Sequence, residues 1–71
     1  MITYAPLWET MKKRGISQYS LIHKYNISPA QITRLKRNES VSIHTIDMFC
    51  EILRCEVEDI MKYIPNNYYY K

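Results

Sequence analysis

The chain has 71 residues, a hydrophobic fraction of 46% and a formal net charge of +3. A chain of this length makes one small domain, which buries only about 60% of its unfolded surface. No apolar run approaches the roughly 20 residues that a membrane span needs, and the basic cluster near the N-terminus follows the apolar residues, unlike the order in a signal peptide. We therefore expect a cytoplasmic protein without a membrane partner.

Charge is distributed unevenly along the sequence. Residues 1–46 carry seven Lys or Arg against two acidic residues, a balance of +5, whereas residues 47–71 carry three against five, a balance of −2. One side of the domain would then face a polyanion while the other faces away. A mixed, solvated surface is the alternative, and charge alone does not separate the two.

Helical patterns begin near the N-terminus. Pro6 can open a first helix that Gly15, the single glycine, ends, and Leu7, Trp8 and Met11 form its apolar stripe. Two short helices are expected next, over about residues 17–25 and 28–37. Each of these begins with a serine that can cap it, and a tight turn at an asparagine joins them.

The helix over about residues 28–37 carries polar and basic side chains once Ile32 and Leu35 are turned inward. Such a face suits a DNA major groove, which is about 12 Å wide and admits one helix. The candidate base-contacting residues are Ala30, Gln31, Thr33 and Arg34. Arg34 is the first choice because arginine pairs bidentately with guanine; the alternative is a solvated surface arginine.

Contacts to phosphates would hold this helix in the groove. Gln18 can donate from its side-chain amide at the start of the preceding helix. The candidate phosphate-contacting residues are Gln18, Ser28, Lys36, Arg37, Asn38, Ser42, His44 and Thr45. Simple helix capping is the alternative explanation for Ser28 and Ser42.

Two further helices are expected in the C-terminal half. The fourth runs from Ser42 to near Arg54, and a short fifth runs from near Glu56 to Pro65. The residues of the fifth helix that are expected to face inward are Val57, Ile60, Met61 and Ile64. Because no convincing strand pattern occurs, the predicted class is all-α, with residues 1–65 as the domain and residues 66–71 as a Tyr-rich tail.

No pattern in the sequence indicates an enzyme. Cys50 and Cys55 lie five residues apart, and on one continuous helix they would point to different sides. We expect them to be reduced and partly buried, with no metal bound. A single glycine excludes a glycine-rich nucleotide loop, so no cofactor is expected.

The order of helices over about residues 5–64 resembles the XRE-type, phage-repressor and Cro-like helix-turn-helix family. The residues that carry the resemblance are Gln18, Leu21, Tyr25, Ile27, Ile32, Leu35, Thr45 and Ile46. The resemblance implies a compact five-helix lambda-repressor-like domain and a small transcriptional regulator, a repressor, that binds double-stranded DNA.

The sequence departs from this family at four positions of the motif. Ile22 stands where the family usually has a small residue, Asn26 where it usually has glycine, and Pro29 and Ala30 where it often has base-reading polar side chains. These departures keep open an alternative function as a protein-interaction module on the same scaffold. A homodimer formed through the fifth helix and the tail is also expected, and a small-molecule effector is not.

Overall fold

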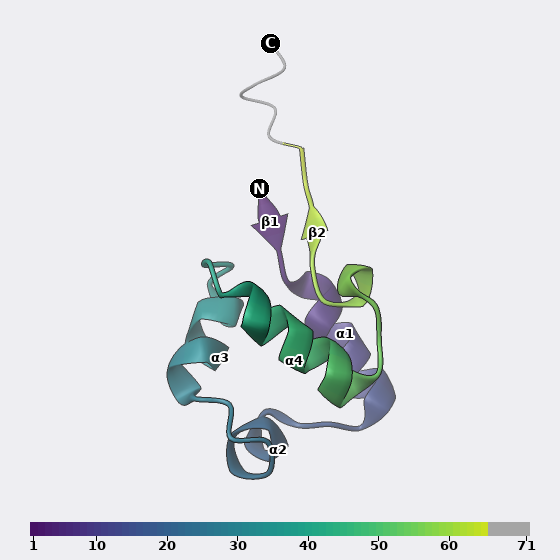
Figure 1. Cartoon of the computed structure of the whole chain (residues 1–71). Helices are drawn as coiled ribbons and strands as arrows, with labels where there is room; N and C mark the ends of the chain where they lie inside the picture. The colour runs from purple at the N-terminus through teal and green to yellow at the C-terminus, as the bar shows by residue number, and fades with distance from the viewer. Residues whose placement is uncertain (66–71) are drawn as a thin grey trace.

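Four α-helices and a two-stranded antiparallel ribbon make up residues 1–65, the part of the chain that this computed structural model describes (Figure 1). The Tyr-rich tail, residues 66–71, lies outside the described residues. In chain order the elements are β1 (Ile2–Thr3), α1 (Ala5–Arg14), α2 (Gln18–His23), α3 (Pro29–Lys36), α4 (Ile43–Leu53), the 3-10 turn η1 (Val57–Asp59) and β2 (Lys62–Tyr63).

Three of the helices begin at the serines that the sequence indicated. The side-chain oxygens of Ser17, Ser28 and Ser42 accept hydrogen bonds from backbone N–H groups three residues later, at 3.1, 3.3 and 3.1 Å. Such a cap satisfies one of the free N–H groups in the first turn of a helix. These predicted helix starts are therefore confirmed.

Every helix contributes a side chain to one hydrophobic core. The fully buried side chains are Leu7 from α1, Leu21 from α2, Leu35 from α3, Phe49 and Leu53 from α4, and Ile60 from the segment that follows η1. Phe49 is the largest of them, and α4 is the helix with two members. No other element contributes as many fully buried side chains as α4, which packs against α1.

The predicted fifth helix is wrong, and the all-α class is right only in part, because the mostly helical domain also contains a small two-stranded sheet. Residues 56–65 instead form one 3-10 turn and then β2, which pairs with β1 in the register Ile2–Tyr63 and Thr3–Lys62. Ile60 is buried, but Val57 and Ile64 are 51% and 42% exposed, so the expected inward face does not exist.

One local and one long-range feature explain why a helix does not continue after η1. The backbone N–H of Glu56 donates to the Asp59 carboxylate at 3.0 Å, which closes a single turn. Backbone groups near the two ends of the described chain then form hydrogen bonds with each other, since the Ile64 N–H donates to the Met1 carbonyl at 2.7 Å. A short isolated helix gains little in water, so this pairing with a distant strand outweighs it.

Within residues 1–65, no helix is both long and apolar enough to cross a membrane.

Candidate nucleic-acid interface

The turn between α2 and α3 is built on a left-handed asparagine. Asn26 has φ of 59°, a conformation that asparagine tolerates better than most residues. Just beyond it, the Ile27 N–H donates to the Leu21 carbonyl at 2.9 Å, and the Ile27 side chain is buried in the core. Asn26 therefore replaces the usual glycine without loss of the turn, and the angle between the two helices is fixed by a buried anchor.

The larger residue in α2 is also accommodated. Ile22 is half-buried and packs against the edge of the core, whereas its neighbour Leu21 fills the interior. The side chain at this position therefore extends along the boundary between core and solvent.

The outward face of α3 is polar and basic, as predicted. Ile32 and Leu35 are buried, whereas Ala30, Thr33 and Arg34 are exposed, as are Lys36 and the Arg37 cap that follows the helix. Pro29 and Ala30 are exposed in the first turn, so this end of the face offers no side-chain hydrogen bonds. The hydrogen-bonding capacity therefore begins one residue later, at Gln31.

Two candidate base-contacting side chains, Thr33 and Gln31, are not freely available to a base in this structure. The Thr33 hydroxyl donates to the Pro29 carbonyl at 3.1 Å, within its own helix. Gln31 is half-buried, and its Oε1 atom is buried without a hydrogen-bond partner in the described residues. An unsatisfied buried acceptor costs about 1–3 kcal/mol, so turning this amide outward would relieve a penalty.

The hydroxyl groups among the candidate phosphate contacts serve as helix caps. Ser28 accepts from Gln31 N–H, and Ser42 accepts from Thr45 N–H while its hydroxyl lies 3.0 Å from the Thr45 hydroxyl. Thr45 is itself buried. A capping hydroxyl still has its own proton to donate, so capping by Ser28 or Ser42 leaves a contact to a phosphate oxygen available.

The remaining phosphate candidates lie at the ends of the helices. Gln18 is half-buried at the first position of α2, and His44 is exposed in the first turn of α4. Lys36 and Arg37 are exposed at the end of α3. Figure 1 shows α3 beside the N-terminal end of α4, so the structure brings the α3 candidates and the α4 candidates to one side of the molecule.

Asn38 has a role that the sequence did not reveal. It adopts a left-handed conformation after α3, with φ of 56°, and its Oδ1 atom accepts from the Tyr4 N–H at 3.0 Å and from the Thr3 hydroxyl at 3.4 Å. The Tyr4 hydroxyl in turn donates to the Glu39 carbonyl at 2.9 Å. The loop after α3 is thereby fastened to the start of the chain. An asparagine after a helix signals the left-handed conformation, but nothing local signals partners more than 30 residues away.

Three of the acidic residues lie away from this side, whereas the exposed Glu39 lies in the loop between α3 and α4. Glu56, Glu58 and Asp59 are exposed at η1, which follows the C-terminal end of α4. In Figure 1 this end of α4 is the one farther from α3. In the described part of the chain, no group of three or more His, Cys, Asp or Glu is placed to hold a metal ion.

Comparison with known proteins gives two matches. The family model described as the Cro/C1-type HTH DNA-binding domain matches residues 6–66. The crystal structure of the transcriptional regulator VanUg (form II) is similar to this structure, with a TM-score of 0.81 and 28% sequence identity over 92% of this chain and 87% of that chain. No curated protein matches the sequence.

Proposed function

Because the chain belongs to the Cro/C1-type helix-turn-helix DNA-binding domain family, we propose that it is a sequence-specific transcriptional regulator that reads the major groove with α3. The observation that carries this proposal is the division of α3 into two faces. Ile32 and Leu35 hold the helix on the core, while the polar and basic face is left in solvent. The likeness to VanUg, whose structure is titled as that of a transcriptional regulator, supports the same function.

Arg34 is the proposed principal base reader. It lies on the exposed face one turn beyond Ala30, and its guanidinium can pair with both acceptors of a guanine edge. Gln31 reads an adjacent position once its amide turns outward, which also removes the penalty on its buried oxygen. Ala30 and Thr33 add contacts to a thymine methyl group or a nearby base edge.

Contacts to phosphates on either side of the groove supply most of the affinity and fix the register. Lys36 and Arg37 bind as cations, Gln18 and His44 donate from side-chain N–H groups, and the Ser28 and Ser42 hydroxyls donate while they cap their helices. The same proposal assigns Asn38 and Thr45 supporting positions at the ends of α3 and α4, where their backbone geometry orients these donors.

Repression by occupancy of a promoter is the specific activity that fits best. The described residues form one small domain, and one helix in one groove gives few base contacts. Such domains reach useful affinity by binding two half-sites one helical turn apart, about 34–36 Å, as a two-fold dimer. Because residues 56–65 form a 3-10 turn and a strand, such a dimer would not pair through a fifth helix.

Selection of bound sequences from a random DNA pool tests the proposal. The wild-type chain should enrich one motif, and Arg34→Ala should lose the preference at one or two positions at a cost of about 1–3 kcal/mol. Arg34→Lys is the matched control for charge: it keeps the cation but cannot make the bidentate pair, so it should restore salt-dependent affinity and leave the preference relaxed. Lys62→Ala removes an equal charge from the ribbon and should leave the motif unchanged.

The alternative function, as a protein-interaction module, is supported by the first turn of α3. Pro29 and Ala30 give the first turn of α3 an exposed surface without side-chain donors or acceptors, which suits a protein partner better than a base edge. If the chain binds no DNA at low salt, or binds with an affinity that salt does not change, the regulator proposal fails and this alternative replaces it.

A further inference from the structure

The two cysteines are brought together by the way α4 ends. The helix stops at Leu53, and Arg54 takes a left-handed conformation with φ of 51°. The N–H of Cys55 then donates back to the Cys50 carbonyl at 3.1 Å. This hydrogen bond, which spans six residues, is the one that marks a Schellman motif, and a contact between the side chains at its two ends frequently accompanies that motif. Cys50 and Cys55 occupy those two positions.

The same closure at the end of α1 shows what normally fills it. There the Ile16 N–H donates to the Met11 carbonyl at 3.0 Å, and Gly15 supplies the left-handed residue. Met11 and Ile16 are apolar, and both pack in or against the core. At the end of α4, Cys50 and Cys55 occupy the positions that correspond to Met11 and Ile16 at the end of α1, so two thiols replace two apolar side chains.

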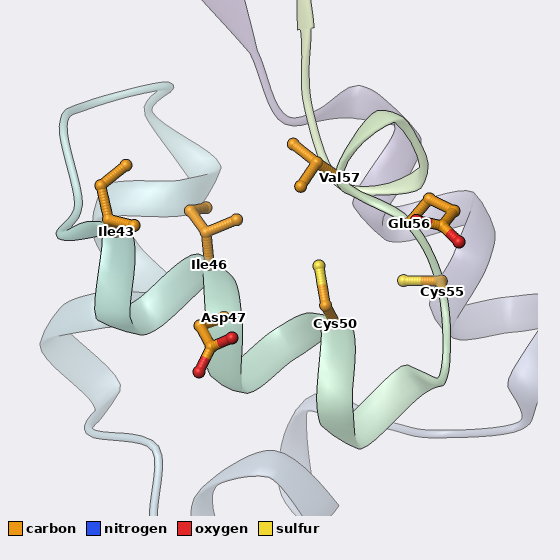
Figure 2. A pocket seen from close by; sticks show the side chains of 7 residues that line it. All are labelled: Ile43, Ile46, Asp47, Cys50, Cys55, Glu56 and Val57. Atoms are coloured by element: carbon orange, nitrogen blue, oxygen red, sulfur yellow. The ribbon is translucent and has the colours of Figure 1, made fainter.

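Both thiols reach one cavity. Figure 2 shows the sulfur atoms of Cys50 and Cys55 directed into the space between α4 and the segment that leads to η1. This cavity has a volume of about 290 Å³, and Ile46 and Val57 line it as well. Both cysteines are free and half-buried, so a small reagent can reach sulfurs that the backbone holds close together.

We propose that Cys50 and Cys55 form a reversible intramolecular disulfide by exchange with a low-molecular-weight disulfide. One thiolate attacks a sulfur of the reagent and releases the first small thiolate, which leaves a mixed disulfide on the protein. The second cysteine attacks the protein sulfur of that mixed disulfide and releases the second small thiolate. Two protein thiols and one reagent disulfide thus become one protein disulfide and two small thiols, which carry away the two protons.

Burial and nearby charges shift the pKa of both thiols. Burial raises the pKa of both thiols, and Asp47, Glu56 and Asp59 raise the pKa of Cys50 further, although a hydrogen bond with Cys55 lowers it. For Cys55, burial, Cys50 and Asp59 raise the pKa, whereas the Arg14 guanidinium lowers it. The hydrogen bond between the two side chains also raises the pKa of Cys55 while it lowers that of Cys50, so either sulfur can attack the reagent first and the other then resolves the mixed disulfide. Raised pKa values mean that the thiolate fraction, and with it the exchange rate, increases as the pH rises above neutrality.

To test this, the full chain is equilibrated in mixtures of 2-mercaptoethanol and its disulfide, and free thiols are alkylated with iodoacetamide. Mass spectrometry then identifies the products. The expected product is a monomer that has lost two hydrogens and takes up no alkyl group. At the midpoint, half of the protein carries the disulfide. The ratio of thiol to disulfide reagent at this midpoint should be at least roughly tenfold higher for the folded protein than for the protein in urea, because the fold holds the two sulfurs close together. Equal midpoints, two stable mixed disulfides, or disulfide-linked dimers would each overturn the proposal.

Single variants and thermal unfolding add two further readouts. Cys50→Ser and Cys55→Ser should each stop at one mixed disulfide; Cys50→Ala and Cys55→Ala serve the same purpose if the hydroxyl prevents folding. Because a bond favoured by the folded state must stabilise that state equally, the oxidised chain should melt on the order of 5 °C above the reduced chain. A Tm that is unchanged or lower on oxidation contradicts the proposed geometry.

Discussion

The segment over α2 and α3 and the segment after α4 contrast in the range of the contacts that shape them. In α2 and α3, two serine caps, one left-handed asparagine and a buried isoleucine after the turn specify the geometry within about 20 residues. After α4, η1 is local, but β2 exists only because β1 lies at the other end of the chain. A pattern of apolar spacing is sufficient for the first segment and misleading for the second.

The largest expected effect separates the observed C-terminal segment from the helix that the spacing predicted. Ile60→Ala removes a fully buried side chain and should lower the free energy of unfolding by about 2–5 kcal/mol. Val57→Ala and Ile64→Ala trim exposed side chains and should each change it by about 0.5 kcal/mol or less. Urea unfolding followed by circular dichroism measures all three.

A helical segment would give a different pattern. In that case all three side chains would face the core and all three substitutions would be costly. Leu35→Ala in α3, another fully buried position, is the matched control for the first segment and should cost as much as Ile60→Ala. If Ile60→Ala is nearly neutral while Leu35→Ala is not, the C-terminal segment is less firmly packed than the structure indicates.

The contrast also explains which features the sequence could predict. The helix starts, the turn at Asn26 and the inward direction of Ile32 and Leu35 follow from neighbours within one or two turns. The pairing of Ile2 with Tyr63 depends on residues about 60 positions apart, so no local pattern reveals it. The spacing of Val57, Ile60, Met61 and Ile64 fits a helix by coincidence, since an exposed 3-10 turn contributes the first of them and an exposed strand end the last.

The candidate interface divides in the same way. The exposed face of α3 could be predicted because two buried residues determine the orientation of the whole helix. Tertiary packing determines two other features, which the sequence does not predict. The Asn38 side chain accepts hydrogen bonds from Tyr4 and Thr3, and the Gln31 oxygen is buried without a partner. The approach of Cys50 to Cys55 involves residues that are close in sequence, but it requires a left-handed backbone at Arg54. Arginine rarely adopts this conformation, so the sequence does not predict it.

The next effect concerns the contact that joins the loop after α3 to the start of the chain, at β1. Asn38→Gly keeps the left-handed backbone but removes the acceptor for the Tyr4 N–H, so we expect a loss of about 1 kcal/mol in the free energy of unfolding. Alanine, unlike asparagine or glycine, is strained in the left-handed conformation, so Asn38→Ala should lower the free energy of unfolding by roughly 1 kcal/mol more than Asn38→Gly does. Hydrogen exchange should show the Tyr4 amide losing protection in both variants. If Asn38→Gly is neutral and Tyr4 stays protected, the loop after α3 is not held by this contact.

A smaller effect tests the double role of Ser28 as a cap and a phosphate contact. Ser28→Ala removes the cap on Gln31 N–H and should cost about 1 kcal/mol of stability. Ser28→Asp keeps a capping oxygen, so the stability should be retained, but the added negative charge should weaken DNA binding. Fluorescence anisotropy with labelled DNA, well below the Tm of each variant, separates the two effects. Equal DNA affinity for Ser28→Asp and the wild type would leave Ser28 with a capping role alone.

The smallest effect tests how far local sequence determines the turn between α2 and α3. At Asn26, glycine adopts the left-handed conformation without strain but loses more conformational entropy on folding, so these two terms oppose each other. Asn26→Gly should therefore change the free energy of unfolding by only a few tenths of a kcal/mol, whereas Asn26→Ala should cost roughly 1 kcal/mol. A difference between these two variants, measured in the same urea titrations, isolates the backbone term from the loss of the amide. If both variants are equally destabilised, the asparagine side chain rather than its backbone holds the turn, and the turn is then specified by a contact that spacing does not encode.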